Sequence, residues 1–346
     1  MTTLLLSGLA VTAAVCASLT AAVIPLLRRA RVVDVPGDRS LHRTPVPRGG
    51  GLAIVLAASL ATWTAVLAAV HLQGAVHAMS GVGVALMGLA TVLAFALLGL
   101  IEDLFSMSVR TRLVLQLVLG AGLGLVAHSA FEVSLWWTPA ICVGTAALVN
   151  ATNFMDGANG LACGHALLTS LWYVQVAAIA PVAGLGLVMV SVAGACLGFL
   201  PFNTPRAKVF LGDSGSYALG SAWAFAVTAC LSRGVAVEAA SAPVLVLLAD
   251  TGYTLWMRLR AGQCWYEPHR LHVYQRLVCA GWPHWASALL VTLAAAACSA
   301  LAAGSLLTSN RLWMPQVAMA AVLIVYLKMP SIIGAPNPFP TLRRAR

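Results

Sequence analysis

The chain has 346 residues, of which 60% are hydrophobic and only 9% are charged, and its mean hydropathy is +0.91. So few charges cannot cover a water-facing surface with polar groups, which excludes a soluble globular protein. The net charge of +10 would suit a nucleic-acid partner, but the basic residues alternate with long apolar runs and form no face studded with aromatic residues. We therefore predict an integral membrane protein that binds no nucleic acid.

Apolar runs recur along nearly the whole chain, and most approach the roughly 20 residues that a helix needs to cross a membrane. The alternating pattern of a membrane barrel is absent, so we predict an all-α, polytopic membrane protein with about 10–11 transmembrane helices in a single domain, 1–346. The first run has no basic segment before it and is longer than a signal-peptide core, which favours a permanent helix. The predicted spans are 3–27, 51–70, 82–101, 113–128, 139–153, 165–181, 182–201, 216–232, 239–257, 285–305 and 311–328, with a tight turn at Pro181.

The basic residues predict how these helices are oriented. If the N-terminus lies outside, every Lys and Arg except Arg233 and Arg311 falls on the cytoplasmic side. Such a bias is what the positive-inside rule requires. Trp136 and Trp137 then lie at the outer membrane boundary, where aromatic residues are enriched. We expect a periplasmic N-terminus and a cytoplasmic C-terminus.

The acidic residues gather on the same cytoplasmic side, and only Glu132 and Glu238 lie elsewhere. Acidic residues contribute little to orientation, so their concentration indicates a functional site. Converging carboxylates repel one another unless a cation lies between them, and hard oxygen ligands favour Mg²⁺, which usually also binds substrate phosphates. We predict a phosphate-handling site built from four stretches: GLIEDLFSMSVRTR (99–112), NATNFMDGANGL (150–161), RAKVFLGDSGSYALG (206–220) and EPHRLHVYQRL (267–277).

In the segment FLGDSGS, Asp213 stands between two glycines just before a predicted helix. Glycines permit a tight turn, and a helix N-terminus offers free N–H groups to an anion, so an Asp there can hold a metal whose phosphate ligand rests on the helix end. The simpler alternative is an ordinary helix N-cap formed by Asp or Ser. The segment DGANG around Asp156 likewise has two interpretations, part of the site or a plain turn.

Glu102 and Asp103 are adjacent, and successive residues on a helix diverge by about 100°. Only one of the two can therefore point at a given spot, and we expect Asp103 to face a metal or to act in catalysis. The alternative is that both carboxylates are simply solvated at a helix end.

The stretch PHRLHVYQRL places His269 and His272 one helical turn apart, with Arg270 between them. Cys264 and Cys279 lie nearby and allow a zinc site, although their spacing is loose. A second interpretation is a cationic wall for phosphate or sugar hydroxyls, and a third is a basic helix on anionic lipid headgroups. The eight cysteines show no CxxC and lie mostly in apolar runs, so we predict no disulfide.

A further basic stretch, RRARVVDVPGDRSLHRTPVPRGGG (28–51), mixes Pro and Gly with Arg39, His42, Arg43 and Arg48. Its composition indicates a loop whose arginines contact lipid headgroups. The lone His165 at the start of a span is expected to be a structural group.

Taken together, these stretches resemble the polyprenyl-phosphate N-acetylhexosamine-1-phosphate transferases, the family that includes the translocase starting lipid-linked peptidoglycan synthesis. The resemblance runs from Asp34 to Leu277 and keeps one order: D-x-P-x-x-R-x-x-H-x-x-P-x-P-R-x-G-G at 34–50, the acidic pair, N-x-x-N-x-x-D-G-x-N-G-L, G-D-S-G-S and the His-bearing YQRL loop. The HR-x-H-x-YQRL form resembles the branch that starts O-antigen and other surface polysaccharides, whereas the peptidoglycan translocase has three consecutive histidines.

The resemblance implies transfer of an N-acetylhexosamine-1-phosphate from a UDP-amino sugar to undecaprenyl phosphate or another polyprenyl phosphate, with release of UMP. The sugar would be N-acetylglucosamine or a 6-deoxy or epimeric relative. The resemblance also implies Mg²⁺, with Mn²⁺ as a substitute, a multi-pass location in a bacterial inner membrane with the active site at the cytoplasmic face, and compatibility with a homodimer.

By the same resemblance, Asp213 and Asp156 bind the metal, and Asp103, Glu102 and Asp156 take part in catalysis. The substrate-binding residues that it implies are Asn153, Asn159, Arg112, His269, Arg270, His272, Arg39 and His42. Two positions depart from the family, because Glu102 stands where Asp is frequent and Asn159 stands where many members have a second Asp. Asn brings no charge, which weakens any arrangement that needs two metal-binding carboxylates in that loop.

Two other classes of protein remain as alternatives. A transporter would place ionisable residues near the membrane midplane and often contains internal repeats, whereas this chain shows no repeat and its acids gather at one face. A catalytically inactive scaffold would not need Asp103, Asp156 and Asp213 together.

Overall fold

The structure is a computed structural model, and it describes residues 2–37, 41, 44–73, 75–180, 182–264, 266–267, 269–306 and 313–336. The α-helices are α1 (Thr2–Arg29), α2 (Gly51–Gln73), α3 (Ala75–Phe105), α4 (Val109–Phe131), α5 (Thr138–Phe154), α6 (Leu161–Ile179), α7 (Leu185–Asn203), α8 (Gly212–Ser232), α9 (Val237–Ser241), α10 (Leu245–Arg260), α11 (Val273–Cys279), α12 (His284–Ala302) and α13 (Met314–Ile332). Three short 3₁₀ turns are η1 (Leu135–Trp137), η2 (Ala242–Val244) and η3 (Ala303–Leu306). Strands β1 (Val33–Asp34) and β2 (Val46–Pro47) pair antiparallel.

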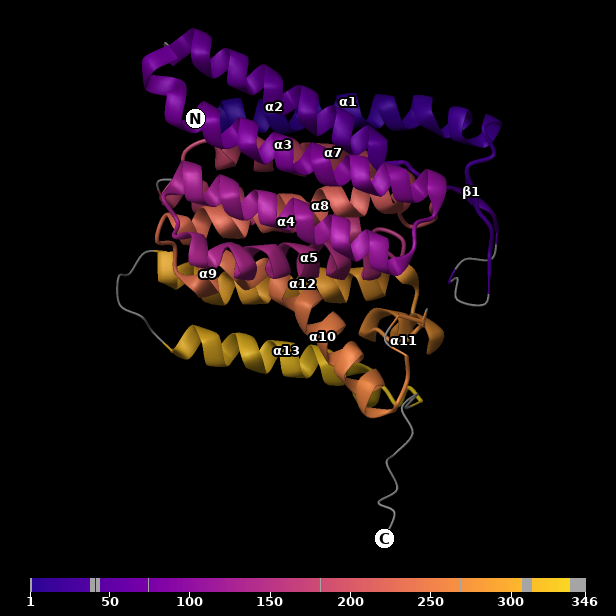
Figure 1. Ribbon diagram of the computed structural model, residues 1–346. Coiled ribbons are helices and arrows are strands. Elements are labelled where there is room, and N and C mark those ends of the chain that lie inside the picture. The colour runs from indigo at the N-terminus through magenta and orange to yellow at the C-terminus, as the bar shows by residue number, and fades with distance from the viewer. Residues whose placement is uncertain are drawn as a thin grey trace.

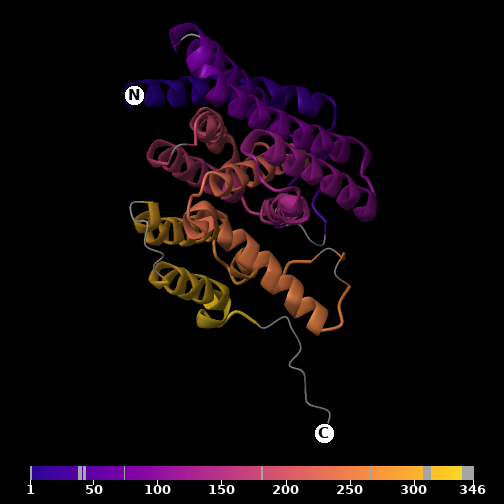
Figure 2. The same cartoon turned by 60° about the vertical axis from the view of Figure 1, so that its left-hand side comes forward.

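The long helices form one bundle with two distinct ends. Figure 1 shows them lying side by side, with β1 and α11 at one end and α9 at the other. Figure 2 shows α10 leaving the bundle obliquely, toward the end that carries α11. Within the bundle α8 is central, because every residue from Gly212 to Ala226 is buried and α3 and α5 pack along it.

The helices confirm an all-α, polytopic membrane protein. Within the described ranges eight helices are long and apolar enough to cross a membrane, namely α1, α2, α3, α4, α6, α7, α12 and α13. Each of the eleven predicted spans coincides with helical structure, including the pair that forms α6 and α7, although Pro181, where the tight turn was predicted, lies outside the described residues. Three of the eleven predicted spans do not form one long apolar helix. The helix α5 has only 17 residues, α8 begins with a polar segment, and the span predicted at 239–257 is interrupted.

The interruption lies at Pro243, in the 3₁₀ turn between α9 and α10. Proline has no N–H to continue a helix, so carbonyl oxygens before it need other donors. Two aromatic side chains of α6 supply them: Trp172 Nε1 donates to the Ala239 carbonyl and Tyr173 Oη to the Ala240 carbonyl, each at 2.8 Å. The predicted continuous span is therefore replaced by two helical pieces whose join is sealed by α6.

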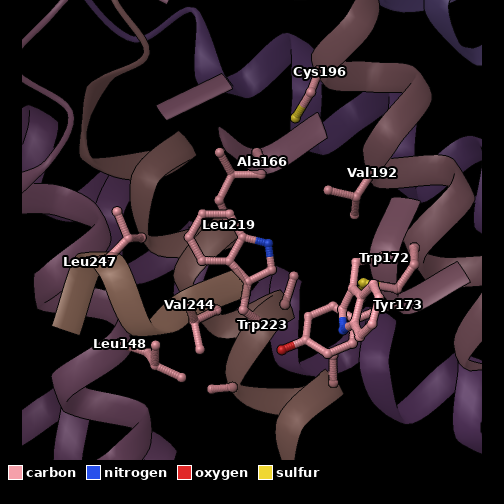
Figure 3. Packing of buried hydrophobic residues seen from close by; sticks show 14 of the residues in the cluster. Leu148, Ala166, Trp172, Tyr173, Val192, Cys196, Leu219, Trp223, Val244 and Leu247 are labelled. Atoms are coloured by element: carbon pink, nitrogen blue, oxygen red, sulfur yellow. The ribbon is translucent and has the colours of Figure 1, made fainter. Parts of the chain in front are cut away.

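His165 on α6 seals the same break, as expected of a structural histidine. It is fully buried, and its Nε2 lies 2.8 Å from the Pro243 carbonyl oxygen. The ring meets Trp223 of α8 edge-on, with 5.1 Å between centroids. Figure 3 shows Trp223 packed among Leu219, Val244 and Leu247 in this part of the core.

Close backbone contacts set the position of the start of α8. A Cβ atom on Gly99 of α3 would overlap the backbone of Asp213, and one on Gly51 of α2 would overlap the backbone of Gly215. Gly212 has a φ of +78°, in the left-handed region that favours glycine. The first turn of α8 is therefore held between α2 and α3, at the end of the bundle that carries α11.

Candidate active site

A cavity of about 300 Å³ opens at the α11 end of the bundle. Four chain segments that are distant in sequence converge on it, from residues 34–48, 153–159, 203–213 and 269–284. Its lining residues are Asp34, Leu41, Arg48, Asn153, Phe154, Asp156, Gly157, Ala158, Asn159, Asn203, Phe210, Gly212, Asp213, His269, Tyr274, Gln275 and His284. The cavity thus draws on three of the four stretches singled out in the sequence, together with the loop before α2.

Asp103 caps α8 from the neighbouring helix. Its two carboxylate oxygens accept the backbone N–H groups of Asp213, at 3.0 Å, and of Ser214, at 2.9 Å. The first N–H groups of a helix lack partners within the helix, and the Asp103 carboxylate from α3 accepts hydrogen bonds from two of them. Its negative charge also interacts favourably with the positive end of the helix dipole. Asp213 does not serve as an N-cap for its own helix, because no side chain of α8 caps it. Asp103 is fully engaged and lies outside the lining of the cavity.

Arg48 bridges the two acidic residues. Its Nε lies 3.1 Å from Asp103 Oδ1, and its Nη2 lies 2.8 Å from Asp213 Oδ2. Burial alone would lower the pKa of Arg48, but Asp213 and Asp103 outweigh that effect and raise the pKa above its usual value. The composition of the loop favoured lipid-headgroup contact for Arg48, and the structure places this residue in the lining of the cavity.

Backbone pairing puts Arg48 in this position. A parallel bridge joins Arg48 to Phe210, with the Phe210 N–H donating to the Pro47 carbonyl at 2.8 Å and the Gly50 N–H donating to the Phe210 carbonyl at 2.9 Å. Arg48 and Phe210 are 162 residues apart in sequence, so neither loop predicts this pairing by itself. The only signal was the P-R-x-G-G element of the motif at 34–50.

Asn153 orients Asp213. Its Nδ2 donates to Asp213 Oδ1 at 2.7 Å and to Ser216 Oγ at 3.0 Å. Each carboxylate oxygen of Asp213 is therefore held by a different partner, Asn153 on one side and Arg48 on the other. The stretches N-A-T-N and G-D-S-G-S, which are far apart in sequence, thus meet in space, as the sequence predicted.

Asp156 faces the same cavity but lacks such support. Within the described residues its carboxylate accepts no hydrogen bond, while Asp213 and Asp103 are the nearby negative charges and Arg48 the nearby positive one. Burial, and next the negative charge of Asp213, raise the pKa of Asp156 well above its usual value. A carboxylate in this state is poised to accept a cation.

Glu102 and Arg112 pair with each other, away from the cavity. Glu102 Oε1 lies 3.4 Å from Arg112 Nη1, and Oε2 accepts the Met107 N–H at 3.0 Å. The angular separation of adjacent helical residues sends Glu102 to another side of α3 than Asp103. The predicted catalytic role of Glu102 and the predicted substrate contact of Arg112 therefore find no support in their placement.

The two histidines of the loop before α11, His269 and His272, point to different surroundings. His269 lines the cavity, and its Nδ1 accepts the Leu271 N–H at 3.3 Å. Burial, then His272 and Arg258, lower the pKa of His269 to about 4, so this ring is neutral at pH 7. Its proton therefore sits on Nε2, which makes it a neutral hydrogen-bond donor instead of the predicted cation.

His272 turns away from the cavity and is buried, with Nδ1 3.0 Å from Asp250 Oδ1. Arg270 is half-buried and does not line the cavity. Arg39 and His42, two further predicted substrate contacts, lie outside the described residues.

Two asparagines that line the cavity, Asn159 and Asn203, make hydrogen bonds that require an amide side chain. Asn159 Nδ2 donates to the Pro205 carbonyl at 3.1 Å, which an ionised aspartate cannot do. Asn203 accepts the Gly160 N–H at 2.7 Å and donates to the Val209 carbonyl at 3.1 Å. Asn203 was not predicted as a site residue, and Asn159 lines the cavity as expected.

The side chains that line the cavity suit one of the two metals that the sequence allows, magnesium, better than the other, zinc. Among the residues that the structure describes, no three His, Cys, Asp or Glu side chains converge as ligands, and His272 is committed to Asp250, so the zinc interpretation finds no support. Asp156 and Asp213 offer two hard carboxylates to one cavity. That pair fits Mg²⁺, which takes one or two protein carboxylates and completes its shell with water and substrate phosphates.

Comparison with known proteins gives the same assignment as the motifs. Residues 85–231 match the model for glycosyl transferase family 4. A decaprenyl-phosphate N-acetylglucosaminephosphotransferase of Mycobacterium leprae is 32% identical over 307 residues, covering 78% of this chain and 75% of the relative.

Two further relatives extend the comparison. A probable undecaprenyl-phosphate N-acetylglucosaminyl 1-phosphate transferase of Bacillus subtilis is 28% identical over 300 residues, covering 78% of this chain and 77% of the relative. A phospho-N-acetylmuramoyl-pentapeptide-transferase of Desulforudis audaxviator is 29% identical over 297 residues, covering 75% of this chain and 85% of the relative. With this extent of similarity and the shared motifs on one cavity, the chain belongs to the polyprenyl-phosphate N-acetylhexosamine-1-phosphate transferases of glycosyl transferase family 4.

Proposed function

We propose that the protein transfers an N-acetylhexosamine-1-phosphate from a UDP-amino sugar to a polyprenyl phosphate and releases UMP. The observation that carries the proposal is the convergence of Asp156, Asp213, Arg48 and the neutral His269 on one cavity at the end of a membrane-spanning bundle. Such a cavity suits a diphosphate that arrives from water and a phosphate that is anchored in lipid. The relatives' names supply the reaction class.

For the metal we propose Mg²⁺, with Mn²⁺ as a substitute, held by Asp156 and Asp213. When bound, the ion neutralises negative charge on the diphosphate and on the leaving phosphate. Asn153 and Arg48 keep the two Asp213 oxygens in fixed directions for this task.

In the proposed reaction an oxygen of the lipid phosphate attacks the β-phosphorus of the donor. The bond from that phosphorus to the bridging oxygen breaks in the same step, and UMP leaves with the electron pair. His269 donates its Nε2 proton as a hydrogen bond to a phosphate oxygen without adding charge. Asp103 acts as a positioning residue, because its oxygens already hold α8 and Arg48.

We further propose UDP-N-acetylglucosamine as the first donor to test, with its 6-deoxy and epimeric relatives as alternatives, and undecaprenyl phosphate as the acceptor. The product would start a lipid-linked O-antigen or other surface polysaccharide at the cytoplasmic face of a bacterial inner membrane. The His-bearing loop supports this branch, since it reads H-R-L-H instead of three consecutive histidines.

The test uses the full-length protein in detergent with undecaprenyl phosphate, Mg²⁺ and a panel of UDP-amino sugars, and it follows UMP release. We expect release that requires lipid and metal, and a loss of about 100-fold or more in kcat for Asp213→Asn. Glu132→Gln is the matched control, because this residue follows the last turn of α4 and does not line the cavity.

The outcome separates the transferase from the inactive scaffold. If well-folded protein releases no UMP from any donor, the transferase proposal fails and the scaffold is favoured. If Asp213→Asn keeps full activity, the assignment of the cavity fails even though the reaction stands.

A further inference from the structure

Asp250 of α10 is a fully buried carboxylate that does not line the cavity. Its Oδ2 accepts the Tyr326 hydroxyl at 2.7 Å and the Val273 N–H at 3.1 Å. Its Oδ1 lies 3.0 Å from His272 Nδ1 and accepts the Thr254 hydroxyl at 3.2 Å. A buried carboxylate is costly unless its oxygens are satisfied, and here the donors come from α10, α11, α13 and the loop before α11.

This cluster adjoins a cavity-lining residue. The His272 ring lies 4.9 Å from the His269 ring, centroid to centroid, and His269 lines the cavity. Farther along, Tyr274 also lines the cavity and donates its hydroxyl to the Phe154 carbonyl at 2.9 Å. The segment 269–274 is therefore held at His272 and Val273 by Asp250, and at Tyr274 by the end of α5.

The segment that is held has little structure of its own. Between α10 and α11 the described residues form no helix or strand, and the Glu267 N–H donates to the Cys264 carbonyl in a turn. An irregular segment keeps one conformation only where outside contacts impose it. Asp250 supplies such contacts at His272 and at the first residue of α11.

We propose that Asp250 and Tyr326 are positioning residues, through which the C-terminal helix α13 sets the place of His269 in the cavity. Neither residue touches the cavity, and both act through His272 and the start of α11. The inference rests on the proposed function, since it assigns to His269 a contact with the donor diphosphate.

The test is a double-mutant cycle between Tyr326 and His269. Tyr326→Phe removes one hydroxyl and keeps the ring, so it disturbs the fold less than any change at Asp250. We expect Tyr326→Phe to lower kcat/KM by about tenfold in the otherwise unchanged protein and by less than about twofold in the His269→Ala background. Asp250→Asn should follow the same pattern with a larger loss.

Tyr173→Phe is the matched control, because it also removes a buried hydroxyl bond, to the Ala240 carbonyl in the α9 region. It should lower the melting temperature and leave the effect of His269→Ala unchanged. If the effects of Tyr326→Phe and His269→Ala multiply as independent changes, or if folded Tyr326→Phe has full activity, the positioning role is overturned.

A second readout separates this inference from the proposed function. The affinity for UDP-N-acetylglucosamine, measured calorimetrically without acceptor lipid, should show the same non-additivity. If the effects of Tyr326→Phe and His269→Ala on binding are coupled but no UMP is released, the transferase proposal is contradicted and the positioning role stands. Full UMP release with uncoupled positions would do the opposite.

Discussion

Arg48 is the residue whose role depends most on its surroundings. It is a flexible loop arginine by sequence, yet the folded chain places its guanidinium between two carboxylates, with its side chain still 39% exposed. The planar fork of arginine can reach both partners at once, which the single ammonium of lysine cannot. Arg48 therefore serves as the internal counterion of Asp103 and Asp213.

We expect Arg48→Ala to lower the melting temperature and to lower kcat/KM by about 100-fold, because Asp103 and Asp213 are left facing each other without a counterion. Arg48→Lys should have a melting temperature and a kcat/KM between those of Arg48→Ala and those of the unchanged protein. Thermal unfolding and UMP release measure these effects, with Arg28→Ala, an exposed arginine at the end of α1, as the control. Equal behaviour of Arg48→Lys and the unchanged protein would contradict the bridging role.

Asp156 lowers the stability of the metal-free protein near neutral pH. Its folded pKa is raised, so the folded state binds the proton more tightly than the unfolded state does. Stability from this group is therefore present below the unfolded pKa and is lost as the pH rises through the raised pKa. This loss of stability accompanies a function, because a carboxylate that accepts no hydrogen bond is available to bind a cation.

We predict that Asp156→Asn melts a few degrees higher than the unchanged protein at pH 7 without metal, and that the difference disappears near pH 4. The same variant should lose nearly all transferase activity. Melting curves across this pH range check the sign, and Glu132→Gln should show no comparable gain. A variant that melts lower at pH 7 would refute the electrostatic account.

At the scale of elements, glycines decide how closely the helices meet. Gly99 and Gly51 allow α3 and α2 to touch the backbone of the first turn of α8, and Asp103 then reaches that turn as a cap. The same packing brings Asp213 to the cavity. A helix displaced by the width of a methyl group would lengthen both hydrogen bonds of Asp103 beyond the usual range.

We therefore expect Gly99→Ala to lower kcat/KM by at least about tenfold while the protein still reaches the membrane, because backbone atoms cannot move aside as a side chain can. Gly83→Ala on the same helix is the matched control, since a Cβ atom there meets open space. UMP release and melting temperature are the measurements. Full activity in folded Gly99→Ala would show that this contact does not position α8.

At the scale of the whole molecule, the site lies at one end of the bundle, and the basic residues predict that this end faces the cytoplasm. Cys264 is an exposed thiol that follows α10 near that end. We expect a membrane-impermeant maleimide to label it in inverted vesicles and not in sealed right-side-out vesicles. Cys264→Ser is the control, and labelling from the outside would reverse the orientation.

Composition, the length of the apolar runs and the spacing of the motifs are enough to identify the class of the protein and several residues of its site. Long apolar runs require helices wherever lipid denies hydrogen bonds to the backbone, so the all-α fold and most of the span positions followed from composition and length, while the break at Pro243 did not. The motifs identified Asp213, Asp156, Asn153 and Asn159 as one group because their spacing repeats that of a known family, and all four line one cavity.

Which residues meet in the site becomes visible in the folded chain alone, because contacts across loops depend on packing between segments far apart in sequence. It placed Arg48 between Asp103 and Asp213, and it turned Glu102 and Arg112 away from the cavity. Period and composition describe neighbours on one helix and cannot describe a bridge between β2 and the start of α8. The neutral state of His269 likewise arises from burial and from the neighbouring His272 and Arg258, which surround this ring only after folding.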